Sequence, residues 1–91
     1  MNKLEAEKLL RRIEVRRLFE KPEDSFSLDE IRIITTEFIQ HAVQNTDWRF
    51  LNTALKLVDW LQEKGYITPE IRQLEYVAFT AMRLHCGLPN S

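Results

Sequence analysis

Apolar residues recur every three or four positions along most of the chain, which is the spacing that places side chains on one face of an α-helix. In the segment 28–44 this face consists of Leu28, Ile31, Ile34, Thr35, Phe38, Ile39 and Ala42. The corresponding face is wider in the segment 48–64 and widest in the segment 69–86. A wide apolar arc indicates a helix that packs against two neighbours. We therefore expect the helices at 48–64 and 69–86 to form the interior pair, with Leu55 and Phe79 in the core.

The residues around Ser27 are typical of a helix start. The Ser27 hydroxyl can accept a hydrogen bond from a free N–H group of the first turn. Glu30 can accept one from the N–H of Ser27 in return, which completes a capping box. Phe26 and Ile31 stand at the two positions that form a hydrophobic staple. These residues predict a helix that begins immediately after Ser27.

Glycine and proline mark the other helix boundaries. Thr68 followed by Pro69 is typical of a helix start, because proline is tolerated in the first turn. Gly65 and Gly87 each precede an apolar residue, and both are expected to end helices as in a Schellman motif. The segment 45–47 supplies the remaining break.

These signals predict an all-α fold with four helices in one domain that covers residues 1–91. The helices are expected at 3–20, 28–44, 48–64 and 69–86. Because two of the connections are only a few residues long, their flanking helices should pack as antiparallel neighbours. The expected architecture is a four-helix bundle, mainly antiparallel and up-and-down, with a charged N-terminal helix set off by the short loop 21–27.

The N-terminal helix differs from the others because its apolar residues form two opposed stripes. The first stripe contains Ala6, Leu9, Leu10 and Ile13 and is expected to face the domain. The second stripe consists of Leu4, Val15, Leu18 and Phe19. Soluble monomers tend not to leave such a patch uncovered. Either a second copy covers it in a homodimer, or the helix clamps a different protein. In the third alternative Leu18 and Phe19 fold back and leave only Leu4 and Val15 exposed.

Composition and charge narrow the range of functions. The chain has 13 basic and 14 acidic residues, a net charge of −1 and a pI near 6.1. This balance argues against strong binding to nucleic acid or to an anionic membrane. The single cysteine, Cys86, excludes an intramolecular disulfide. No apolar segment is long enough for a signal peptide or a membrane span. We expect a cytoplasmic protein.

Few side chains suit catalysis or metal binding. The only histidines are His41 and His85, and Cys86 adjoins the second of them. Consecutive helical residues point about 100° apart, so His85 and Cys86 do not easily share one metal ion. Two glycines cannot make a phosphate-binding loop. We expect neither an enzyme nor a bound cofactor or metal.

Basic residues gather in the segment Arg11–Arg17, but acids stand at helical spacing from its arginines. The pairs are Glu7 with Arg11, Glu14 with Arg17, and Arg16 with Glu20. Such pairs predict a solvated and self-neutralised helix face.

Trp60 falls on the polar flank of the helix at 48–64, near Arg49 and Lys56. An exposed tryptophan beside basic residues is typical of a recognition hot spot. Cover from the N-terminal helix or from a chain end would instead make Trp60 a structural residue.

The favoured function is a non-catalytic helical protein-interaction module, such as an adaptor, a small subunit or a regulator. We expect it to bind a protein partner, or a second copy of itself, through the N-terminal helix and the Trp60 flank. The candidate partner-binding residues are Leu4, Val15, Leu18, Phe19, Arg49, Lys56 and Trp60. The alternative is a nucleic-acid-binding regulator that uses Arg11–Arg17, or Arg49 with Lys56.

Overall fold

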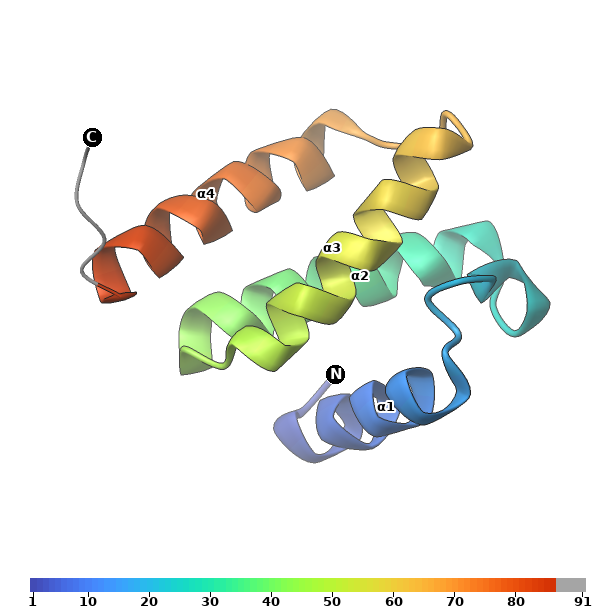
Figure 1. Cartoon of the computed structure of the whole chain (residues 1–91), viewed down its shortest axis with the longest axis horizontal. Helices are drawn as coiled ribbons and strands as arrows, with labels where there is room; N and C mark the ends of the chain where they lie inside the picture. Colours follow the sequence, from blue (N-terminus) through green and yellow to red (C-terminus); the bar gives the residue numbers. More distant parts are fainter. Residues whose placement is uncertain (87–91) are drawn as a thin grey trace.

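The computed structural model describes residues 1–86, apart from the side chains of His85 and Cys86, and in this part of the chain helices are joined by short turns and loops (Figure 1). The helices are α1 (Lys3–Arg16), α2 (Leu28–Asn45), α3 (Trp48–Glu63) and α4 (Pro69–Cys86). A short 3₁₀ helix, η1 (Pro22–Asp24), lies between α1 and α2. The predicted all-α fold class with four helices is confirmed, and no strand occurs within residues 1–86.

The central helix of the molecule is α2. It packs along much of both α3 and α4, while α3 and α4 touch each other over a much shorter stretch. Helix α1 contacts α2 and α3 and lies on the opposite side of them from α4 (Figure 1). The prediction that α3 and α4 form the interior pair is therefore wrong. Because the apolar arc of α4 meets mainly α2, part of that arc stays exposed.

The core lies where α2 and α3 face each other. Phe38 of α2 is fully buried, and its ring meets Phe50 of α3 edge-to-face with centroids 5.1 Å apart. The His41 ring stacks on Phe50 at a centroid distance of 5.6 Å, so this histidine contributes to packing. From α1 the core receives Ala6, Leu10 and Ile13. Their burial fixes which side of α1 faces the domain.

The predicted helix starts are confirmed. The Ser27 hydroxyl accepts from the Glu30 N–H at 3.2 Å, and Glu30 Oε1 accepts from the Ser27 N–H at 3.0 Å. The bond from the Ser27 N–H favours the ionised carboxylate and is the main reason that the pKa of Glu30 is lowered. Phe26 and Ile31 line the same small apolar gap, as expected for a hydrophobic staple. At the start of α4, the Thr68 hydroxyl accepts from the backbone N–H three residues later at 3.3 Å.

The turn after α3 has the glycine that the sequence predicts. Gly65 adopts a φ of +75°, and its N–H donates to the carbonyl of Gln62 at 3.1 Å. The N–H of Tyr66 donates to the carbonyl of Leu61 at 2.8 Å, which completes a Schellman motif. The other predicted glycine cap, Gly87, lies outside the described residues.

Two further helix ends use the same left-handed conformation without glycine. Arg17 has a φ of 53° and Thr46 a φ of 47°. After α1, the N–H of Leu18 donates to the carbonyl of Ile13 at 2.9 Å, so the helix ends at Arg16. The prediction that this helix continues to residue 20 is therefore wrong. The left-handed residue at position 17 turns the chain back toward the domain and redirects the side chains that follow.

Candidate partner-binding surface

The early end of α1 decides the fate of its second apolar stripe. Leu18 and Phe19 follow the turn at Arg17 and pack, half-buried, against the core. Leu4 and Val15 remain on the helix and point to solvent, with 61% and 76% of their surface exposed. Of the alternatives for this stripe, the structure therefore matches the fold-back of Leu18 and Phe19.

Contacts with α3 hold α1 in this orientation. The Lys56 ammonium lies 4.1 Å from the centroid of the Phe19 ring, within the range of a cation–π interaction. The Thr53 hydroxyl donates to Glu14 Oε1 at 3.2 Å. The first contact involves the segment just after α1 and the second involves α1 itself, and neither covers Leu4 or Val15.

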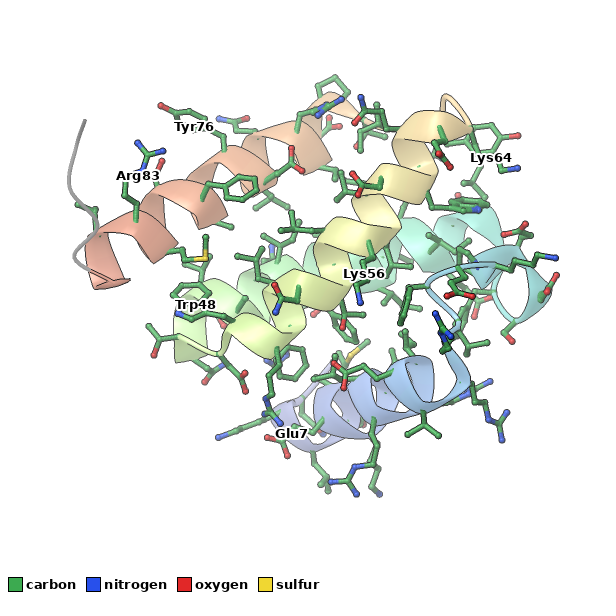
Figure 2. All side chains as sticks on the ribbon, in the orientation of Figure 1. Glu7, Trp48, Lys56, Lys64, Tyr76 and Arg83 are labelled. Atoms are coloured by element: carbon green, nitrogen blue, oxygen red, sulfur yellow. The ribbon has the colours of Figure 1, made fainter. Side chains whose placement is uncertain are left out.

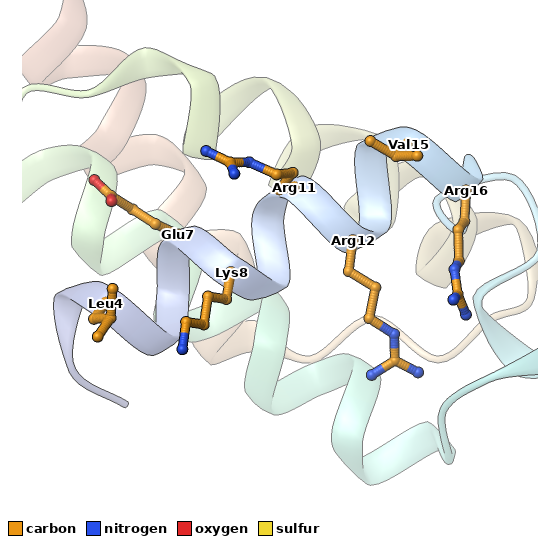
Figure 3. A pocket seen from close by; sticks show the side chains of 7 residues that line it. All are labelled: Leu4, Glu7, Lys8, Arg11, Arg12, Val15 and Arg16. Carbon is orange, nitrogen blue, oxygen red and sulfur yellow. The ribbon is translucent and has the colours of Figure 1, made fainter.

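We call the opposite side of this helix the α1 outer face. It consists of Leu4, Glu7, Lys8, Arg11, Arg12, Val15 and Arg16, which surround a shallow hollow of about 490 Å³ (Figure 3). The volume is in the range of small-molecule sites. All seven residues belong to one helix, however, so no opposite wall would enclose a small ligand. The geometry suits contact with another surface.

The cations of the α1 outer face are less neutralised than the sequence predicts. Because α1 ends at Arg16, Glu20 is not one helical turn away from Arg16 and does not pair with it. The Glu20 carboxylate pairs with Arg17 instead. Glu14 accepts from Thr53, as described above, and forms no ion pair with Arg17 within residues 1–86. The three predicted pairs are therefore not formed among the described residues.

Among residues 1–86, Arg12 is the only one of the four cations on this face with a partner. Its guanidinium lies 5.4 Å from the centroid of the Phe26 ring. Lys8, Arg11 and Arg16 form no ion pair with any residue in the described part of the molecule. Since the face holds four cations and a single acid, Glu7, its local charge is positive although the whole chain is slightly acidic.

The Trp60 flank is not a surface site. Trp60 has only 9% of its surface exposed and belongs to the core, with its ring 6.2 Å from that of Tyr66. The turn at Gly65 brings Tyr66 back beside α3, where it lies against Trp60. Of the two alternatives for Trp60, the structure therefore matches the covered, structural residue, and the contact comes from Tyr66 after the turn at Gly65.

Arg49 and Lys56, the cations predicted on the same flank, both have partners within the chain. Asp47 caps α3 and accepts from the Arg49 side chain at 2.9 Å and 2.6 Å. This bidentate contact lowers the pKa of Asp47 and raises the pKa of Arg49. Lys56 lies over Phe19, as described above.

A second apolar surface, which the sequence analysis missed, belongs to α4. Phe79 has 40% of its surface exposed, so its predicted place in the core is wrong. Tyr76 points away from the rest of the molecule, as Figure 2 shows, and Val77 and Leu84 are exposed too. Between α2 and α4 lies a groove of about 210 Å³, which is lined by Ile39, Gln40, Val43, Gln44, Leu74 and Val77. The unusually wide apolar arc of this helix was the signal that could have revealed it.

The remaining observations bear on other functional classes. Within the described residues, no three His, Cys, Asp or Glu side chains come together as a metal site requires. None of the helices there has the length and hydropathy of a membrane-spanning segment. No protein-family model matches the sequence, and no curated protein or solved structure shows significant similarity to it.

Proposed function

We propose that this chain is a non-catalytic protein-interaction module of the cytoplasm, an adaptor, small subunit or regulator that binds its partner through the α1 outer face. In this proposal the helices form a mainly antiparallel bundle, and the charged N-terminal helix is presented at its side. On the α1 outer face, only Arg12 makes a described contact with the domain, through the Phe26 ring, and Leu4 and Val15 do not enter the core.

The observation that carries the proposal is the exposure of Leu4 and Val15. The two residues are eleven positions apart, about three helical turns, and therefore lie on the same side of α1. Neither contributes to the core, and each would bury apolar surface only against another molecule. A surface of aliphatic side chains surrounded by cations suits a protein partner, because it can form both apolar and charged contacts.

The nucleic-acid alternative has less support. Arg49 and Lys56 already have partners in Asp47 and Phe19, so the pair is not available as a phosphate-binding site. Arg17 is paired with Glu20. Phosphate contacts would also leave Leu4 and Val15 without a partner.

The proposal is tested by affinity capture from cells that express the protein with substitutions on this face. The double variant Leu4→Glu/Val15→Glu replaces two exposed residues, so its stability should change by only about 0.5 kcal/mol per site. The matched control is Ile33→Glu/Tyr76→Glu, which makes the same change at exposed residues of α2 and α4. Circular dichroism and thermal melting check that each variant is folded.

We expect wild type and control to capture the same partner, and Leu4→Glu/Val15→Glu to retain about a tenth of it or less, which corresponds to a loss of about 1.4 kcal/mol. Equal capture by all three proteins would contradict the proposal. So would loss of the partner in the control alone, because the binding surface would then include α4 or α2.

A further inference from the structure

We infer that the α1 outer face recognises an acidic amphipathic helix in its protein partner. The inference rests on the proposed function and adds the chemical class of the partner segment. Two features of the face lead to it, namely the order of side chains along the helix and the sign of their charge.

Four residues form one continuous ridge along α1. Leu4, Lys8, Arg11 and Val15 follow each other at intervals of four, three and four positions, which keeps them on the same side of the helix. The ridge therefore has an aliphatic residue at each end and two cations between them. Figure 3 shows Leu4 and Val15 at opposite ends of the face, with Lys8 and Arg11 on either side of the line between them.

A complementary helix has the same spacing with the opposite charge. It would place aliphatic residues against Leu4 and Val15 and carboxylates against Lys8 and Arg11. The four partner residues must lie on one side of their own helix to reach the ridge. They therefore have the same i, i+4, i+7, i+11 spacing as Leu4, Lys8, Arg11 and Val15. Arg12 and Arg16 stand along one border of the ridge and extend the positive surface toward the rim of such an interface.

A second copy of the chain does not satisfy this face. In a two-fold antiparallel pair of α1 helices, Leu4 would meet Val15 of the second copy, which is favourable. The same symmetry would place Lys8 against Arg11 of the second copy, because both pairs are centred on the same point of the helix. Like charges in direct opposition weaken an interface. The charge pattern therefore favours a partner that is acidic where this chain is basic.

Nucleic acid is also a poor match. Phosphates would engage the cations but leave Leu4 and Val15 in water, and apolar exposure is the feature that distinguishes this face. Glu7 belongs to the same face and would lie close to a bound polyanion.

The inference is tested with two synthetic helical peptides of about 18 residues, long enough to form a helix in isolation. The acidic peptide has two leucines eleven positions apart, and glutamates at the fourth and seventh positions after the first leucine. The neutral peptide has glutamines in place of these glutamates. Fluorescence anisotropy measures the binding of each to wild type, to Lys8→Gln/Arg11→Gln, and to a control, Arg72→Gln/Arg83→Gln, that removes two exposed cations of α4.

Wild type and the α4 control should bind the acidic peptide about three- to tenfold more tightly than the neutral one, the range expected for two exposed ion pairs. Lys8→Gln/Arg11→Gln should bind both peptides equally, because the peptide glutamates then have no cations to pair with. The two peptides and the two proteins together form a double-mutant cycle that measures this coupling. The preference should also decrease as salt is raised from about 50 mM to about 500 mM.

Three results would overturn the inference. The first is equal binding of both peptides to wild type, or binding of neither. The second is a preference for the acidic peptide that survives in Lys8→Gln/Arg11→Gln. The third is the presence of another occupant on this face. Anisotropy would show it as tighter binding of a DNA duplex than of the acidic peptide, and light scattering would show it as a wild-type dimer that dissociates in Leu4→Glu. If cellular capture depends on Leu4 and Val15 while the peptides show no preference, the proposed function stands and only the partner class is wrong.

Discussion

At the scale of single residues, the turns between the helices depend on backbone conformations with positive φ. Gly65 adopts this conformation without steric cost, whereas Thr46 adopts it with a β-branched side chain. The steric cost of a Cβ atom at positive φ can therefore be tested twice, by removing a Cβ at Thr46 and by adding one at Gly65.

We predict that Thr46→Gly raises the free energy of unfolding by about 1 kcal/mol, because glycine removes the clash of the left-handed conformation. Gly65→Ala should lower it by a similar amount, since a Cβ there meets no atom within 4 Å and only the backbone conformation is affected. Urea denaturation measures both. A loss of stability in Thr46→Gly would contradict the helix end described at this residue.

The capping box predicts a dependence on pH. The pKa of Glu30 is lower in the folded chain than its ordinary value of 4.5, because the carboxylate accepts hydrogen bonds from Ser27. The stabilisation is therefore fully present above pH 4.5 and is lost as the pH falls through the lower folded value.

Accordingly, Ser27→Ala should lower the free energy of unfolding by about 0.5–2 kcal/mol near neutral pH. Urea titrations from neutral pH into acid should show the difference between wild type and Glu30→Gln shrinking as the carboxylate becomes protonated. A difference that stays constant down to the acid limit would show that the charged form is not the one that caps α2.

At the scale of the helices, burial distinguishes α2 from α4. Phe38 on α2 is fully buried, while Phe79 on α4 is partly in solvent. Phe38→Ala should therefore cost about 3–5 kcal/mol through lost burial and the cavity left behind. Phe79→Ala should cost roughly 1 kcal/mol, which is typical of a less buried site. Chemical denaturation compares the two variants, and equal losses would mean that α4 is packed as deeply as α2.

The sequence is sufficient to predict features that depend on local hydrogen bonds. The box at Ser27, the start after Thr68 and the turn at Gly65 each involve residues a few positions apart, and each is found in the structure. The end of α1 could not be predicted in this way, because arginine at position 17 carries no signal for a left-handed turn.

Features that depend on packing between helices are less accessible from the sequence. The periodicity of α4 shows which residues are apolar, but not that α2 covers only part of their arc. Trp60 is covered by a turn whose position depends on Gly65, so its local sequence gives a misleading indication of exposure. In contrast, the prediction that Leu4 and Val15 stay on the surface if Leu18 and Phe19 fold back needs only helical geometry, and it agrees with the structure.

At the scale of the whole molecule, the two outer helices expose surfaces of different chemistry. The α1 outer face combines aliphatic side chains with four cations, of which Arg12 alone has a partner among residues 1–86. The α2–α4 groove is apolar with glutamines along it and has no charged residue in its lining. Because α1 and α4 lie on opposite sides of the α2–α3 pair, a partner bound at one face leaves the other accessible (Figure 1).

The most direct test of the central claim, that the α1 outer face is the binding surface, is an NMR titration of the isotopically labelled protein with the purified protein that wild type captures from cells. We predict that the largest amide shift changes fall on α1, around Lys8 and Arg11, and that α4 changes little. Shift changes centred on Val77 and the α2–α4 groove, with α1 unaffected, would contradict the account.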